Sequence, residues 1–267
     1  MNGATQGKDS SVARLGTSIL EALSVLGTAL GLVVKAWSSP RLLWRRRDKI
    51  ITELVSIGTN TLPIATLVSF FIGMVLVIQT ADQLSNYSQE ILGSVVGIAM
   101  TKELGPVIIA FLVAGRVGSA VAAQLGSMSI NDEINALRTM DIDPVEFLVT
   151  PRTVAMTLAV PVLVLYADAV GILGGLVAVR IDPSITVSSS QFWDNLVSWL
   201  NMRDLIVGMI KGLFFGLTIA VVSCTLGLRT RGGTAEVARA TTAAVVWSFV
   251  LVIVMDYFIV RAAVLLS

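Results

Sequence analysis

The sequence predicts an all-α membrane protein with five transmembrane helices, an N-terminal amphipathic helix in the membrane interface and a short cytoplasmic helix. Three observations predict this fold class. Hydrophobic residues make up 55% of the 267 residues and charged residues only 14%, whereas soluble proteins carry about 25% charged residues. Five apolar runs are long enough to cross a bilayer, which takes about 20 residues. Lys and Arg residues gather on one side of these runs.

The composition excludes several classes of function. A formal net charge of +1 argues against a nucleic-acid-binding protein. The chain has no His, which excludes histidine-based catalysis and histidine metal ligands, and its single Cys224 excludes an internal disulfide. No segment matches G-x-x-x-x-G-K-[ST], so we expect no P-loop nucleotide site. We therefore predict a non-enzymatic chain with no catalytic residues, no metal site and no cofactor of its own.

The first 50 residues are predicted to precede the membrane domain. Residues 1–11 are small and polar, lack a signal-peptide pattern and are expected to be retained and disordered. Apolar residues recur at helical spacing over 12–37, which predicts either an interfacial amphipathic helix or a sixth span. We favour the interfacial helix because glycines interrupt the run. A basic linker, which suits anionic headgroups, then continues to residue 50.

A single transmembrane domain is predicted over residues 51–267. Its five spans lie at about 62–80, 94–118, 154–179, 205–228 and 237–260. Pro63 suits the first turn of span one, and Pro161 predicts a kink in span three. Spans three and four carry glycines four residues apart, which predict close helix packing within the chain. These are Gly171, Gly175, Gly208, Gly212 and Gly216.

The positive residues set the predicted orientation. One side of the spans carries Arg41, Arg45, Arg46, Arg47, Lys49, Arg116, Arg138, Arg152, Arg229, Arg231 and Arg239. The other side carries Arg180, Arg203 and Arg261, with Lys211 just inside span four. Because cytoplasmic loops hold an excess of Lys and Arg, we predict a cytoplasmic N-terminus and a periplasmic C-terminus.

A polar segment after span two predicts the short cytoplasmic helix. Ser129 followed by Asp132 fits a capping box, so the helix is expected to start at 129–131. Glu133 adds negative charge to the first turn and Arg138 adds positive charge near the end, as the helix dipole favours. One apolar stripe is formed by Ile130, Ile134 and Leu137. Such a helix is too short to span a bilayer and must lie against another surface, with or without a protein partner.

Charge inside span two is the most informative feature of the sequence. Lys102 and Glu103 lie about nine residues into an apolar run, where an ionisable group costs about 2.5–3.5 kcal/mol. Adjacent helical residues point about 100° apart. The two side chains therefore either pair with different partners or divide between a partner and a cavity. If the span instead starts at Leu104, both lie at the interface and Arg116 lies in the membrane.

Several motifs in order resemble those of the MlaE/YrbE family. They are K-E-L-G-P from Lys102, A-G-R-V-G-S-A from Ala114, D-E-I-N-A-L-R from Asp132, P-R at 151–152 and G-G-T-A-E-V-A-R-A-T-T at 232–242. The resemblance implies a permease subunit of an ABC transporter in the bacterial inner membrane, moving lipid, with phospholipid the first expectation. It further implies a homodimer, an ABC ATPase that binds ATP and Mg²⁺, and an MCE-domain protein.

The resemblance also implies roles for individual residues. Lys102 and Glu103 would lie by the substrate cavity, together with Leu76, Leu84 and Tyr87 at the outer end of span one. The family more often has Arg at the position of Lys102. The Lys ammonium lacks the planar guanidinium geometry that binds phosphate through two parallel hydrogen bonds. The short helix would be the coupling helix that docks on the ATPase, through Ser129, Asp132, Glu133, Asn135 and Arg138.

Two other functions are compatible with the residues alone. A secondary transporter or channel could use the intramembrane Lys102, Glu103, Asp168 and Asp256 as proton or ion sites. A membrane scaffold without transport activity would need none of them. A bound ATPase partner would distinguish the permease from both alternatives.

Overall fold

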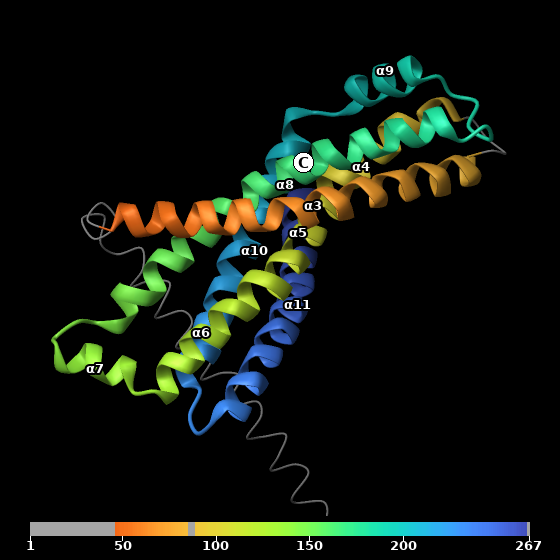
Figure 1. Cartoon of the computed structure of the whole chain (residues 1–267). Helices are drawn as coiled ribbons and strands as arrows, with labels where there is room; N and C mark the ends of the chain where they lie inside the picture. Colours follow the sequence, from red (N-terminus) through yellow and green to blue (C-terminus); the bar gives the residue numbers. More distant parts are fainter. Residues whose placement is uncertain (1–45, 85–88, 266–267) are drawn as a thin grey trace, which may run out of the picture.

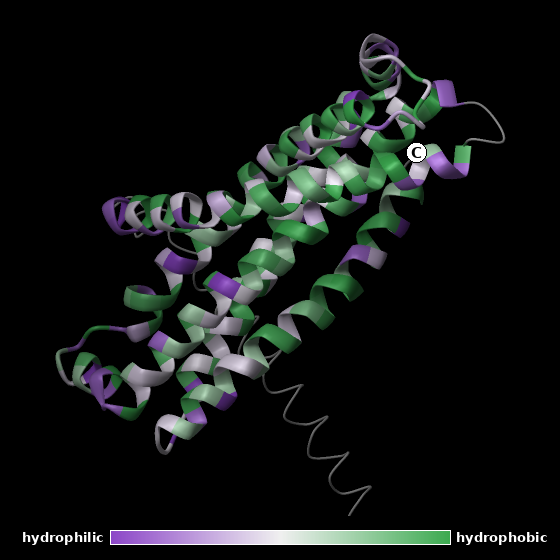
Figure 2. Cartoon of the chain, turned by 45° about the vertical axis from the view of Figure 1, so that its right-hand side comes forward, coloured by the Kyte–Doolittle hydropathy of each residue, from purple (hydrophilic) through white to green (hydrophobic). Residues whose placement is uncertain are grey.

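The computed structural model describes residues 46–84 and 89–265, and within these ranges it is helical without strands. Five helices are long and apolar enough to cross a membrane, which confirms the all-α membrane fold class. The expected interfacial helix at 12–37 lies outside the described residues. The bundle is long, with α7 and α9 at opposite ends and hydrophobic residues along the length between them (Figures 1 and 2).

The five spans are longer than the sequence predicts, because each helix continues beyond the apolar run. Span one is α3 (Arg47–Leu84), span three is α8 (Thr150–Ile181), span four is α10 (Met202–Arg229) and span five is α11 (Thr234–Leu265). Span two is built of α4 (Leu92–Ala99), η2 (Met100–Leu104), α5 (Gly105–Val113), η3 (Ala114–Gly118) and α6 (Ser119–Ile130). The shorter elements are η1 (Gln89–Ile91), α7 (Glu133–Thr139), η4 (Val145–Val149) and α9 (Ser189–Trp199).

Helix α8 is the centre of the bundle, and α3 packs closely along it. The buried side of α3 repeats every fourth residue from Ile57 to Ala81. Gly73 lies directly against the carbonyl of Gly171, and Gly174 lies against the carbonyl of Phe70. Small residues let two backbones approach in this way. On the other side of α8, Gly216 of α10 lies against the carbonyl of Met156, so the predicted packing of glycines within the chain is confirmed.

Helices α3 and α11 leave broad apolar faces uncovered. Only 17% of the most apolar window of α11 is buried, compared with 56% for α8. The exposed apolar residues on α11 include Trp247, Ile253, Tyr257 and Phe258. In a single chain these faces are available to lipid or to another subunit.

The predicted start of the short helix at 129–131 is wrong. Helix α6 continues through Ile130, and the chain turns at Asp132, whose φ is 60°. Ser129 does not cap a helix, because its hydroxyl donates a hydrogen bond of 2.8 Å to the carbonyl of Thr230. Helix α7 therefore begins at Glu133. The apolar stripe is present, with Ile134 buried and Leu137 packed against the core.

The close α3–α8 contact generates a stability prediction. A Gly73→Ala substitution places a methyl group against the carbonyl of Gly171, and overpacking of this kind costs about 1–3 kcal/mol. We expect Gly73→Ala to lower the midpoint temperature of thermal unfolding relative to the unchanged protein. The midpoint is the temperature at which half of the protein in detergent no longer elutes as a monodisperse peak on gel filtration. Gly58→Ala in the same helix is the control, since a Cβ there meets no atom within 4 Å. Equal midpoints for the two variants would contradict the close approach.

Candidate functional site

The charged pair of span two lies in a π-helical segment. Lys102 and Glu103 belong to η2, which interrupts the α-helix between α4 and α5. Segments of this kind occur often at functional sites. The Lys102 amine lies 2.7 Å from a carboxylate oxygen of Asp204, and Glu103 lies 2.7 Å from the Lys211 amine. Of the alternatives left open by the sequence, the structure shows two different partners, and both come from α10.

Lys211 is the centre of this network. Its side chain is fully buried, and its amine pairs with Glu103 at 2.7 Å and with Asp256 at 2.9 Å. The same amine donates a hydrogen bond of 2.7 Å to the carbonyl of Lys102. A buried amine requires such compensation, because an unpaired charge in the interior is very costly. Lys211 therefore joins spans two, four and five at one point.

Sequence reasoning missed the role of Lys211, which it counted only as a charge near the outer side. The available signal was a single Lys within the otherwise apolar run from Leu205 to Phe215. By the same rule that singled out Lys102, such a residue needs a partner inside the bundle. Its partners lie about 108 and 45 residues away along the chain, at Glu103 and Asp256, so the spacing could not identify them.

A cavity of about 710 Å³ opens beside the network, between η2, α10 and α11. Its polar wall carries Lys102, Glu103, Arg203, Asp204 and Lys211. The wall formed by α11 is apolar and carries Val260, Ala263 and Val264, while Val207 lies between Asp204 and Lys211 along α10. Charged groups on one wall and aliphatic groups on the other suit a molecule that is itself amphipathic.

The expected residues of span one do not line this cavity. Leu76 and Leu84 pack instead against a separate cluster that includes Val77, Leu92 and Phe192. Tyr87 lies outside the described residues. The cavity around Lys102 is thus built from spans two, four and five, without the outer end of span one that the resemblance implies. The proposed contact of Leu76, Leu84 and Tyr87 with substrate stays a prediction.

Asp256 and Asp168, two of the residues that a secondary transporter or channel could use, lie in different surroundings. Asp256 is paired with Lys211. Asp168 is buried on α8 against Gly105, and in the part of the chain that the structure describes its side chain has no ion pair or hydrogen bond. A Cβ at position 105 would collide with the Asp168 carboxyl, which explains a glycine at the start of α5.

The expected coupling residues divide between two settings at the α7 end. Asp132, Glu133, Asn135 and Arg138 are exposed, while Ile134 faces the bundle. Asn135 donates a hydrogen bond of 2.8 Å to Asp132, which stabilises the turn before α7. Ser129 is half-buried and belongs to the junction with α10. A short helix with a buried apolar side and an exposed charged side has the form expected of a docking element.

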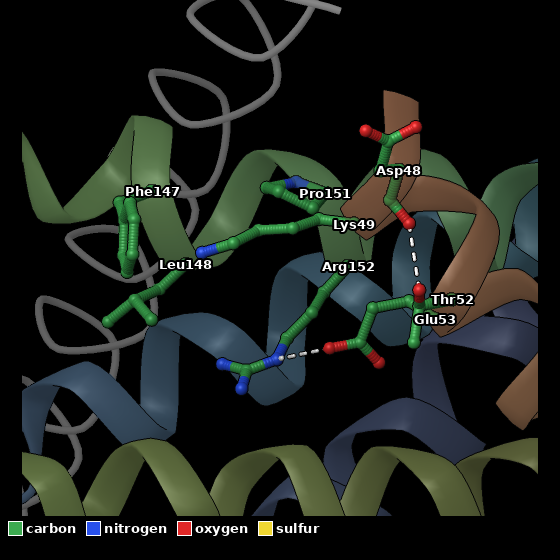
Figure 3. Close-up of a pocket in the computed structure, with 8 residues that line it drawn as sticks. All are labelled: Asp48, Lys49, Thr52, Glu53, Phe147, Leu148, Pro151 and Arg152. Carbon is green, nitrogen blue, oxygen red and sulfur yellow. Dashed lines mark hydrogen bonds and ion pairs between the residues drawn. The ribbon is translucent and has the colours of Figure 1, made fainter. Parts of the chain in front are cut away.

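A second cavity, of about 350 Å³, lies where the segment after α7 meets the start of α3 (Figure 3). Arg152 lies 3.6 Å from Glu53 of α3 and donates a hydrogen bond of 2.9 Å to Gln124 of α6. Lys49 lies 3.3 Å from the ring centroid of Phe147 in η4, a cation–π contact. These contacts connect η4 and the start of α8, which follow α7 in the chain, to α3 and α6.

Comparison with known proteins agrees with the resemblance in the sequence. The family described as permease MlaE matches residues 50–262. A probable ABC transporter permease protein of Rickettsia typhi is 36% identical over 212 residues, 79% of this chain and 81% of its own. The intermembrane phospholipid transport system permease protein MlaE of Haemophilus influenzae is 31% identical over 252 residues, 93% of this chain and 95% of its own.

A plant relative extends the comparison. The chloroplastic protein TRIGALACTOSYLDIACYLGLYCEROL 1 of Arabidopsis thaliana is 35% identical over 228 residues, 85% of this chain and 64% of its own. The family match includes the middle three spans, nearly all of the first and last spans, and every charged residue of the network around Lys211. The chain therefore belongs to the MlaE permease family.

Proposed function

We propose that this chain is the permease subunit of an ABC transporter that moves phospholipid between the bacterial inner membrane and an MCE-domain partner. The observation that carries the proposal is the cavity beside Lys211, which has one charged and one aliphatic wall within the membrane domain of a family permease. The polar wall suits a headgroup and the aliphatic wall suits acyl chains. The phospholipid in the name of the Haemophilus relative supports the same substrate class.

The energy source in this proposal is a separate ATPase, which would bind ATP and Mg²⁺. Its docking element would be α7, whose exposed charges face away from the bundle. Movement of α7 would reach α3, α6 and α8 through the contacts of Arg152 and Phe147. A homodimer would cover the apolar faces of α3 and α11 that a single chain leaves exposed.

The docking proposal is tested by reversing charge on α7. We expect the Asp132→Lys/Glu133→Lys double variant to retain roughly fivefold less ATPase on co-purification, since each exposed charge contributes about 0.2–1 kcal/mol. The permease itself should still insert, because both side chains are exposed. Asp194→Lys on α9, at the opposite end, is the matched control. Undiminished ATPase recovery with the double variant would refute docking through α7.

The cavity proposal is tested at Lys102. Lys102→Ala removes one charge-assisted hydrogen bond, worth about 1.5–3 kcal/mol, so lipid transfer by the reconstituted complex should fall about tenfold or more. Lys102→Arg should keep or raise transfer, because a guanidinium holds phosphate by two parallel hydrogen bonds.

A control separates substrate contact from structural support. Lys102→Ala leaves the buried Asp204 carboxylate without its amine, which could disturb the bundle. The Lys102→Ala/Asp204→Asn double variant removes that unpaired charge. We expect it to regain thermal stability without regaining transfer. Recovery of transfer in the double variant would show that Lys102 only neutralises Asp204.

The orientation is tested by single-cysteine labelling in a Cys224→Ser background. Cys224 is buried, so its replacement removes a poorly accessible thiol. Cysteines placed at 135 and 233 should react only from the cytoplasm, and those at 184 and 194 only from outside. Labelling of position 135 from outside would overturn the proposed orientation.

A further inference from the structure

Within the described part of the chain, Arg116 is a cation of span two whose side chain has no partner. It lies in η3 and is exposed. Lys102 of span two and Lys211 of span four are both neutralised by carboxylates. A guanidinium remains charged under all ordinary conditions. Its position in a membrane helix therefore calls for an anion from outside the described residues.

Contacts between helices give the depth of Arg116. Helix α11 runs antiparallel to span two, because Phe111 stacks on Phe249 with ring centroids 4.6 Å apart and Gly126 packs against Val237. These contacts place residue 116 level with about residue 245. Arg239 is the last charged residue of α11 before Asp256, so Arg116 lies about six residues, roughly 9 Å, deeper than Arg239. A long Arg side chain at this depth can reach headgroup phosphates.

The surroundings of Arg116 leave room for a ligand. A Cβ added at Gly115 would meet no other atom within 4 Å, and Ala120 on the next turn is also exposed. The nearby Ser119 hydroxyl already donates a hydrogen bond of 2.6 Å to the carbonyl of Gly115. Gly115 and Ala120 are thus small, exposed residues next to Arg116 on the surface of span two.

In a second copy of the chain the acids of α11 are already paired, Glu236 with Arg239 and Asp256 with Lys211. Glu53 of α3 is paired with Arg152. Glu103 lies 13 residues from Arg116 along span two, roughly 20 Å, and Asp256 lies 11 residues beyond the level of Arg116 on α11, roughly 16 Å. Asp168 is buried inside the bundle. A lipid phosphate is the anion that membrane surroundings supply at this depth.

We propose that Arg116 binds the phosphate of a membrane phospholipid, at a headgroup site separate from the cavity beside Lys211. The site would lie on the α7 side of the domain, with the open space beside Gly115 accommodating the headgroup. This inference rests on the proposed function for its substrate class. It is nevertheless tested by binding alone, so failure of ATP-driven transport would not by itself decide it.

The test measures equilibrium binding of short-chain phosphatidylglycerol to the full-length chain in uncharged detergent, by native mass spectrometry. Arg116→Gln should raise the Kd about tenfold, because the charge-assisted hydrogen bonds are lost. Arg116→Lys should raise the Kd less, because the positive charge remains although the planar guanidinium with its parallel donors is lost. Gly115→Leu should also weaken binding by filling the open space while it leaves the charge in place. A phosphate-free galactolipid should bind all variants equally.

Arg180→Gln is the matched control, because Arg180 is an exposed arginine at the other end of the domain, and its Kd should be unchanged. If Arg116→Gln fails to fold, Arg116→Lys and Gly115→Leu carry the test. An unchanged Kd in the Arg116 and Gly115 variants would overturn the proposal. Displacement of the lipid by millimolar inorganic phosphate would also overturn the proposal, because it would show that the site binds a free anion. Dissociation of a dimer by Arg116→Gln would overturn it too, because it would show that a second copy of the chain is the partner.

Discussion

The membrane domain depends most on the neutralisation of one buried amine. Lys211 has no contact with solvent, and it is tolerated only because Glu103 and Asp256 reach it from two other spans. Removing either acid would leave a buried charge without full compensation, which typically costs about 3–5 kcal/mol. The same requirement holds η2, α10 and α11 in register at one level of the bundle. The position of the cavity walls follows from that register.

This arrangement keeps the polar wall of the cavity assembled before any ligand arrives. Lys102 is held by Asp204, and Asp204 also accepts a hydrogen bond from the backbone of Asn201 at the start of α10. The charged side chains are therefore positioned by helix ends and by one another. At the α7 end the contacts are an ion pair at 3.6 Å, a hydrogen bond of 2.9 Å from Arg152 to Gln124 and a cation–π contact. The two ends of the domain are thus held by different kinds of contact, a buried charge network beside Lys211 and contacts of Arg152 and Lys49 near α7.

The sequence was sufficient for the number and type of spans, because apolar length and charge are local properties. It also identified Lys102 and Glu103, which stand out against an apolar run. It could not identify Asp204 or Lys211 as their partners, because those contacts form only when α10 packs on span two. The start of α7 was mispredicted because Ser129 and Asp132 match a capping pattern, while a tertiary acceptor, the Thr230 carbonyl, takes the Ser129 hydroxyl. The π-helical segments have no residue signature that would have predicted them.

Those segments change what a single membrane helix can contact. A π turn holds more residues than an α turn, so each one rotates the helix beyond it by about 100° relative to an uninterrupted α-helix. Span two has two of them, on either side of α5. Beyond them the two ends of span two have different neighbours, since α4 packs against α9 and α3, whereas α6 packs against α10 and α11. Deleting one residue from either segment would restore a regular helix and turn one half of span two away from its neighbours, although no side chain in the contacts themselves had changed.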